Sequence, residues 1–165
     1  MRLFGLLVLT AALGCSSPKE QPPAPPTGPV VEWAAMAGEP RPGPENTLLI
    51  DVDLQVTVLQ GWNVYSLTQT TGGPTPMTVS VSEPYSLAGE VIGPPPEMAH
   101  DENFGIETEK YTGEKLFKVP LKLAASSSVA LPPIELKVRS QACSDRLCLP
   151  AKTTTLTVTP DAKPQ

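Results

Sequence analysis

Apolar and polar residues alternate along much of this chain, in short runs that end at proline or glycine. The clearest run, residues 48–58, places five aliphatic side chains on one face: Ile50, Val52, Leu54, Val56 and Val58. This period of two predicts a half-buried β-strand. Little of the sequence after Val30 could sustain a helix longer than two turns.

Further strands are predicted at residues 62–68, 77–82, 115–123, 134–142 and 153–158. Turn chemistry separates them, most clearly at Gly72-Gly73-Pro74 and Leu131-Pro132-Pro133. Several short strands with frequent turns predict an all-β fold, a β-sandwich.

The first fourteen residues are typical of a signal peptide that precedes a lipid-attachment cysteine. Met1 and Arg2 give a positively charged start, residues 3–13 are apolar, and Gly14 precedes Cys15. The apolar run is far shorter than the about 20 residues needed to span a bilayer. We expect cleavage before Cys15 and lipidation of its thiol. An ordinary secretory signal is the alternative, and either one places the chain outside the cytoplasm.

The stretch after Cys15 is rich in proline, favours extended polyproline conformations and cannot form a core. The expected organisation is a signal peptide at 1–14, a lipidated cysteine and tether at 15–28, one sandwich domain at 29–160 and a disordered tail at 161–165. Ser16 favours outer-membrane over inner-membrane sorting in a Gram-negative source.

Charge and motifs exclude several classes of function. The formal net charge of −5 provides no basic surface for nucleic acid or anionic lipid. No phosphate-binding loop, Gly-x-Ser-x-Gly or Cys-His-Asn pattern supports a nucleotide-binding or hydrolase function. We expect no cofactor and no nucleic-acid partner.

Cys143 and Cys148 form the pair that remains once Cys15 is assigned to the N-terminus. Four residues lie between them, too many for the Cys-x-x-Cys of a thioredoxin-type helix start but suited to a tight β-hairpin. Opposed residues of antiparallel strands have a Cα separation that suits a disulfide. The spacing therefore predicts a dithiol or disulfide on a hairpin, in a compartment where disulfides persist.

The alternation through residues 134–142 also predicts which way Cys143 faces. Ala142 falls on the apolar face and Cys143 on the polar face. We expect the sulfur at the surface or under a covering loop, unless a β-bulge precedes it. A purely structural staple is the alternative to a redox role, although so small a ring is worth only about 2 kcal/mol in the chain-entropy relation.

Four segments in order carry a resemblance to a known family: residues 61–69, residues 72–74, residues 100–105 with Glu109 and Tyr111, and residues 141–150. They resemble the N-terminal, immunoglobulin-like domain of the DsbD thiol:disulfide interchange proteins, over roughly residues 30–158. The resemblance implies that Cys143 and Cys148 are the redox pair, with Cys148 the first to attack.

The same resemblance implies partners and a site. Reducing equivalents would pass from a membrane electron-transfer protein to this dithiol and on to thioredoxin-like periplasmic proteins, such as disulfide isomerases or cytochrome-maturation thioredoxins. Phe104 matches an aromatic cap over the disulfide, and Trp62 and Tyr65 match the aromatic lining of the site. Ordinary core packing is the alternative for all three aromatic residues.

Charged residues near the thiols have opposing effects. Asp101 and Glu102 adjoin the cap and, with Asp145, would raise a thiol pKa, whereas Arg146 would lower it. Solvated loop carboxylates are the alternative for Asp101 and Glu102.

A metal site is not expected. Two thiols could bind zinc or copper with His100, and Met77 or Met98 could be added as soft ligands. A blue-copper site needs two histidines, however, and a structural zinc site would lack a ligand.

The sequence contains neither a membrane conduit nor a thioredoxin-like domain, so any reductase activity is expected to act in trans. The alternative function is a non-catalytic binding or assembly module that keeps the sandwich and an inert disulfide.

Overall fold

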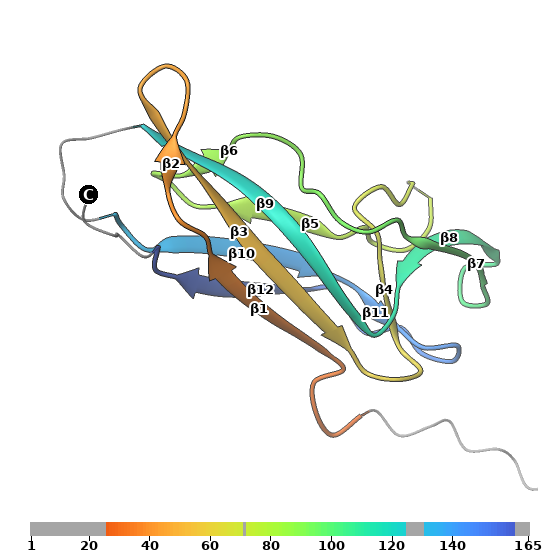
Figure 1. Cartoon of the computed structure of the whole chain (residues 1–165). Helices are drawn as coiled ribbons and strands as arrows, with labels where there is room; N and C mark the ends of the chain where they lie inside the picture. Colours follow the sequence, from red (N-terminus) through yellow and green to blue (C-terminus); the bar gives the residue numbers. More distant parts are fainter. Residues whose placement is uncertain (1–25, 71, 125–130, 161–165) are drawn as a thin grey trace, which may run out of the picture.

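The computed structural model describes residues 26–70, 72–124 and 131–160 (Figure 1). The predicted signal peptide, Cys15, most of the tether and the C-terminal tail lie outside these residues. Every helix or strand in the described part is a β-strand. None of the described residues forms a helix that could cross a membrane.

One layer is a five-stranded antiparallel sheet, in which the long strands β3 and β9 lie side by side (Figure 1). Its strands are β1 (Val31–Ala37), β2 (Arg41–Pro42), β3 (Thr47–Val58), β9 (Glu114–Ala124) and β6 (Ser86–Leu87).

Two smaller antiparallel sheets form the other layer. One has the order β12-β10-β5, made of β12 (Lys152–Val158), β10 (Ile134–Ser140) and β5 (Thr78–Val81). The other has the order β11-β4-β8-β7, made of β11 (Ala142–Cys143), β4 (Asn63–Tyr65), β8 (Ile106–Tyr111) and β7 (Glu97–Asp101). This second sheet lies at one end of the molecule, on the right in Figure 1.

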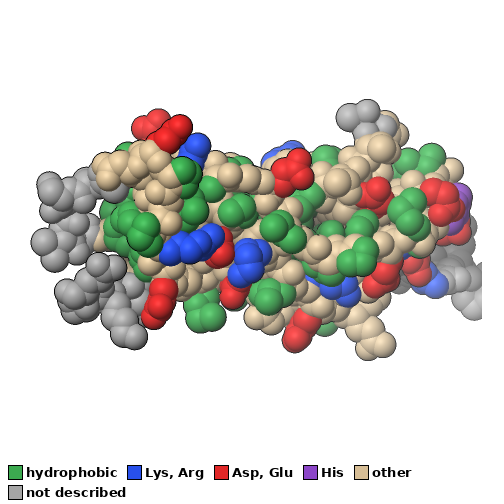
Figure 2. All heavy atoms as spheres, turned by 45° about the horizontal axis from the view of Figure 1, so that its top comes forward, with side chains coloured by type: hydrophobic (Ala, Val, Ile, Leu, Met, Phe, Trp, Pro, Cys, Tyr) green, Lys and Arg blue, Asp and Glu red, His purple; other side chains and the backbone are tan. Residues whose placement is uncertain are grey.

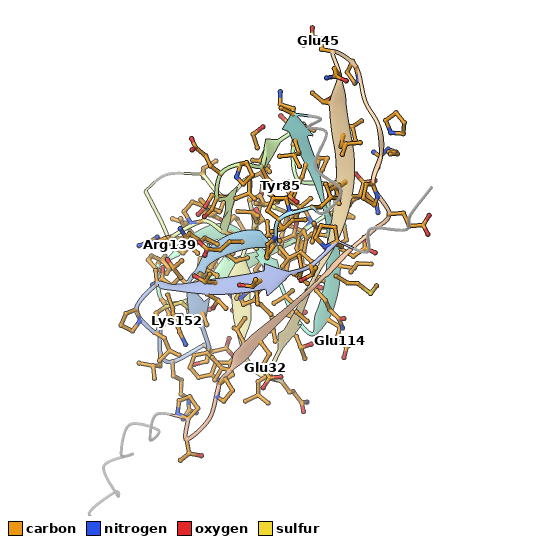
Figure 3. The ribbon with its side chains drawn as sticks, turned by 90° about the vertical axis from the view of Figure 1, so that its left-hand side faces the viewer. Glu32, Glu45, Tyr85, Glu114, Arg139 and Lys152 are labelled. Atoms are coloured by element: carbon orange, nitrogen blue, oxygen red, sulfur yellow. A yellow bond between two sulfur atoms is a disulfide. The ribbon has the colours of Figure 1, made fainter. Side chains whose placement is uncertain are left out.

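The core lies between the layers and is built from the alternating positions of the strands. Inward side chains of β3, β9 and β10 are buried, among them Leu54, Phe117 and Leu136. Tyr85 lies among these packed side chains in Figure 3, and its hydroxyl donates a hydrogen bond to the Pro132 carbonyl at 2.6 Å. Burial on alternate positions of both layers confirms the predicted all-β sandwich.

The predicted strands correspond to β3, β4, β5, β9, β10 with β11, and β12. The strand predicted at 62–68 is regular only over Asn63–Tyr65, and beyond it the Ser66 and Thr68 hydroxyls donate to the Glu109 carboxylate. Strand β1 and the β7–β8 hairpin are additional elements that the alternation did not reveal.

Candidate functional site

Cys143 and Cys148 are joined by a disulfide, and their Cα atoms lie 4.1 Å apart. Backbone hydrogen bonds close the hairpin on both sides of it. Ser144 N–H donates to the Leu147 carbonyl at 2.8 Å, and Leu149 N–H donates to the Ala142 carbonyl at 2.9 Å. The spacing of four residues thus forms the tight hairpin that was predicted, here called the cysteine hairpin (residues 142–149).

The two sulfurs differ in exposure. Cys143 has 0% of its surface exposed, whereas Cys148 is half-buried. Ala142 packs into the sandwich core, and Cys143 points to the opposite face of the sheet. The alternation therefore predicted the direction of Cys143 correctly. Cys143 is buried and not at the open surface.

Gln141 marks the point where the chain passes from one small sheet to the other. Its Oε1 accepts a hydrogen bond from Thr75 N–H at 2.8 Å, and its Nε2 donates to the Leu149 carbonyl at 3.3 Å. These contacts hold the start and the end of the cysteine hairpin to a neighbouring loop. The disulfide is therefore anchored to the sandwich at its base.

Strand β4 borders the disulfide. Asn63 is the cross-strand partner of Cys143, and Val64 is the partner of Ala142. Val64 belongs to the core, so Asn63 and Tyr65 lie on the same face as Cys143. Both side chains are buried.

The β7–β8 loop (residues 102–105) folds back on Asp101. The Asp101 carbonyl accepts hydrogen bonds from Phe104 N–H at 3.3 Å and Gly105 N–H at 2.7 Å. Asp101 Oδ1 accepts another from Asn103 N–H at 3.0 Å. Gly105 has a φ of 66°, which a glycine adopts without the steric cost of a side chain. The loop is therefore a compact turn.

Three contacts hold this loop against the disulfide face. The Tyr65 hydroxyl donates to Asp101 Oδ2 at 2.7 Å. The Phe104 ring meets the Tyr65 ring edge-to-face, with centroids 6.1 Å apart. Asn103 Nδ2 donates to the Ser144 carbonyl at 2.8 Å, directly beside Cys143. These contacts connect the loop and Asp101 to β4 and to Ser144, both of which lie next to Cys143.

Burial strongly raises the pKa of Tyr65, and the hydrogen bond to Asp101 raises it further. The Asn63 amide opposes this rise, although it makes no hydrogen bond of standard geometry to the phenol. Tyr65 is therefore a neutral donor at physiological pH, and it holds the Asp101 carboxylate from inside the sheet.

The predicted site residues separate into two groups. Tyr65, Asp101 and Phe104 come together on the face of β4 that Asn63 shares with its cross-strand partner Cys143. Glu102 is exposed, as are Asp145 and Arg146 at the tip of the cysteine hairpin. Trp62 is half-buried and lines a hollow of about 320 Å³ together with residues 144–147. Figure 2 shows acidic side chains at the end of the molecule that carries β7 and β8.

Two polar residues of the site were not singled out from the sequence, Asn63 and Asn103. Asn63 alternates with Val64 in β4, so its place on the polar face was readable once the strand was assigned. Asn103 lies in a loop, where the sequence has no period that reveals a contact with Ser144.

Two of the residues weighed as metal ligands, His100 and Met77, lie in different surroundings. His100 pairs with Glu107 at the surface, with 3.5 Å between Nδ1 and Oε1, and Met77 is buried in the core. Within the described ranges, no three His, Cys, Asp or Glu side chains gather closely enough to bind a metal ion.

Comparison with known proteins identifies a family. The model of the family "Thiol:disulfide interchange protein DsbD, N-terminal" matches residues 41–160. No curated protein matches the sequence.

Comparison with solved structures found two matches. One is the N-terminal periplasmic domain of ScsB from Proteus mirabilis, with 18% identity and a TM-score of 0.48 over 75% of this chain and 52% of that chain. This chain therefore spans about half the length of that one. The other is the collagen binding subdomain of the Enterococcus faecalis surface protein ACE, with 10% identity and a TM-score of 0.28 over 82% of this chain and 99% of that chain.

Proposed function

This chain belongs to the family of the N-terminal domain of DsbD, a family of thiol:disulfide interchange domains, and we propose that its Cys143–Cys148 pair cycles between disulfide and dithiol. In this role the domain passes reducing equivalents between thioredoxin-fold partners. Cys143 and Cys148 are the reacting groups, and Phe104 is the aromatic cap. Asp101, Glu102, Trp62 and Tyr65 support or line the site.

One observation carries this proposal: the disulfide lies outside the sandwich core, next to a turn that is held to the cysteine hairpin and to β4 by side-chain contacts. Cys143 is buried on the face opposite Ala142, and a few contacts connect the β7–β8 loop to its neighbours. Opening that loop would expose the sulfurs without unfolding a layer of the sandwich. A staple has no need of such a cover.

The difference in exposure supports an order of attack. Cys148 is half-buried and Cys143 is fully buried, so an incoming thiolate of a donor protein reaches the sulfur of Cys148 first. A mixed disulfide forms between the donor and Cys148, and Cys143 leaves as a thiolate. The second donor thiol then attacks the mixed disulfide. Two electrons and two protons move to this domain, and the donor keeps a disulfide.

The proposed location follows from the N-terminal sequence. Cleavage before Cys15 and lipidation of that residue would hold the domain at the periplasmic side of a bacterial membrane, with Ser16 favouring the outer membrane. The prolines of residues 16–28 would act as a spacer of about 3.1 Å per residue between the lipid and the sandwich. A membrane electron-transfer protein would supply reducing equivalents in trans, and thioredoxin-like periplasmic proteins would accept them.

The test is the reduction potential of Cys143–Cys148 in the mature protein with Cys15→Ser, equilibrated against glutathione buffers and read by thiol alkylation and mass. A shuttle is expected to have a potential well above about −300 mV, since structural disulfides of secreted proteins lie below that value. A bond that glutathione and a thioredoxin-fold dithiol both fail to reduce would contradict the proposal and favour the non-catalytic binding module.

A further inference from the structure

Asn63 presents a buried amide whose nitrogen makes no hydrogen bond of standard geometry in the oxidised protein. The residue is 6% exposed, and Nδ2 makes no hydrogen bond of standard geometry with any described residue, although the amide lies close enough to the Tyr65 phenol to affect its pKa. Buried polar groups of this kind are rare, because each one loses its hydrogen bonds to water without replacing them. A buried donor without such a bond in one state of the protein is explained if a ligand or another redox state supplies an acceptor.

The position of Asn63 identifies the group it can reach. Asn63 and Cys143 are directly opposed in the antiparallel pair β4–β11. Opposed residues point to the same face, with Cβ atoms about 4.5 to 5.5 Å apart. The Asn63 amide and the Cys143 sulfur are therefore neighbours beneath the β7–β8 loop.

We propose that Asn63 is a positioning residue that stabilises the Cys143 thiolate, through a hydrogen bond from Nδ2 that forms only when the disulfide opens. The inference rests on the proposed exchange reaction. A disulfide sulfur is a weak acceptor, whereas a thiolate carries a full charge and accepts charge-assisted hydrogen bonds. The amide is thus arranged for the reduced state and is left unsatisfied in the oxidised one.

Each step of the exchange takes place at a specific atom. A donor thiolate attacks the half-exposed Cys148 sulfur, the S–S bond breaks, and its electron pair stays on Cys143. Asn63 Nδ2–H then donates to that anion, which lowers the pKa of this leaving thiol. A leaving thiol of lower pKa leaves faster. In the reverse direction, the same thiolate resolves the mixed disulfide that Cys148 forms with an acceptor.

Nearby charges oppose the thiolate, so a dedicated donor is needed. The Asp101 carboxylate lies on the same side, hydrogen-bonded to Tyr65, and Glu102 and Asp145 are exposed in the two adjoining loops. Negative charges at these places disfavour a thiolate. Solvent screens the exposed charges, Glu102 and Asp145 as well as Arg146 at the hairpin tip, so the buried Asp101 carboxylate has the largest effect.

The first experiment measures the pKa of Cys143 directly, in a Cys148→Ser background where no disulfide forms. The thiolate is followed by its ultraviolet absorbance as the pH is raised. Asn63→Leu, which removes the donor, should raise the pKa of Cys143 by about one unit, the equivalent of a tenfold loss of thiolate stability. Asn63→Thr, which returns a hydroxyl donor, should restore part of the shift. An unchanged pKa in Asn63→Leu would overturn the inference.

The second experiment uses the intact pair in the mature protein with Cys15→Ser. Above the thiol pKa, Asn63→Leu should lower the equilibrium constant for reduction by glutathione about tenfold, which is about 30 mV for a two-electron couple. Below the pKa both forms are thiols and the difference should vanish. An equal shift at every pH would contradict a role at the thiolate.

Thermal unfolding of the oxidised protein separates this role from a structural one. Asn63→Leu removes an unsatisfied amide and should leave the melting temperature unchanged or raised. A fall would identify Asn63 as a structural residue and overturn the inference. Thr108→Val is the matched control, since it removes another buried polar group of the same sheet, one that donates to the Ala99 carbonyl. It should lower the melting temperature without moving the pKa of Cys143.

Failure of the inference remains distinct from failure of the proposed function. The Cys143 pKa is measured without any exchange partner, so it reports on Asn63 alone. If the unmodified disulfide resists every thioredoxin-fold dithiol, the exchange function fails whatever that pKa is.

Discussion

The Tyr65 hydroxyl donates a hydrogen bond of 2.7 Å to the Asp101 carboxylate, and both residues are buried. Tyr65 lies in β4, which borders Cys143, and Asp101 is the last residue before the β7–β8 loop. The pair therefore connects the strand beside the disulfide to the turn that is bonded to the cysteine hairpin. We expect its strength to set how firmly this turn is held as a cover over the disulfide.

Removing this hydroxyl should loosen the cover. Tyr65→Phe leaves a buried carboxylate short of one donor, so we expect a loss of about 1–3 kcal/mol in the free energy of unfolding. We also expect faster reduction of Cys143–Cys148 by a small thiol such as dithiothreitol. Denaturant unfolding and the kinetics of reduction measure the two effects.

Tyr85→Phe is the control for that change. It removes a buried hydroxyl that bonds the Pro132 carbonyl in the core. It should lower stability and leave the reduction rate as it is. Equal acceleration in both variants would mean that global loosening, and not the Tyr65–Asp101 contact, controls access.

Alkaline pH should destabilise the fold through its tyrosines. Burial raises the pKa of Tyr65, Tyr85 and Tyr111 above the ordinary value of 10.0. These phenols therefore remain protonated in the folded protein at pH values where the unfolded chain has released the protons. The free energy of unfolding is unaffected below about pH 10 and falls as the pH rises beyond it.

Urea unfolding at a series of pH values measures this slope. Tyr65→Phe should make the slope shallower above pH 10, because one of the three raised groups is removed. An identical slope in the variant would show that Tyr65 ionises in the folded protein as it does in the unfolded chain.

The Asn103 side chain provides the direct link from the loop to the cysteine hairpin, through its bond of 2.8 Å to the Ser144 carbonyl. Asn103→Ala should speed reduction by a small thiol several-fold. It should cost no more than about 1 kcal/mol of stability, because the side chain is exposed. Glu107→Ala is the control, since Glu107 is exposed on β8 and pairs with His100. An unchanged rate in Asn103→Ala, or an equal acceleration in Glu107→Ala, would contradict the proposed link.

Truncation of Phe104 distinguishes its two interpretations, a cap over the disulfide and an ordinary core residue. As a cap, Phe104→Ala should expose the sulfurs and speed attack by small thiols, with a modest loss of stability because the ring is half-buried. As a core residue, it should lose stability without any change in rate. Ile106→Ala, at an exposed position just after the loop, shows what an apolar truncation does there.

Much of the fold was readable from the sequence because burial follows the strand period. Ile50 to Val58 alternate without exception, and so do Ile134 to Ala142, so the sandwich and the facing of Cys143 followed. The β7–β8 hairpin was not readable, because Glu97, Met98 and His100 are exposed and interrupt any apolar pattern. Strand β1 was obscured by its small alanines.

The site was only partly readable for a related reason. Spacing pointed to the cysteines and a resemblance pointed to Tyr65, Asp101 and Phe104, but contacts that depend on loop geometry have no sequence period. The bond from Asn103 to Ser144 joins residues 41 positions apart. The orphaned amide of Asn63 becomes visible only when the register of β4 against β11 is known.

Single-cysteine variants should behave unequally, because the two sulfurs differ in access. Cys143→Ala leaves the half-buried Cys148, which should form a mixed disulfide with a thioredoxin-fold partner, whereas Cys148→Ala leaves only the buried Cys143 and should form little. Both variants should stay folded, since the ring closed by this bond is worth about 2 kcal/mol against a typical stability of about 5–15 kcal/mol. Non-reducing gels and circular dichroism measure trapping and folding. Equal trapping by the two variants would contradict the order of attack, and global unfolding of both would identify the disulfide as a staple.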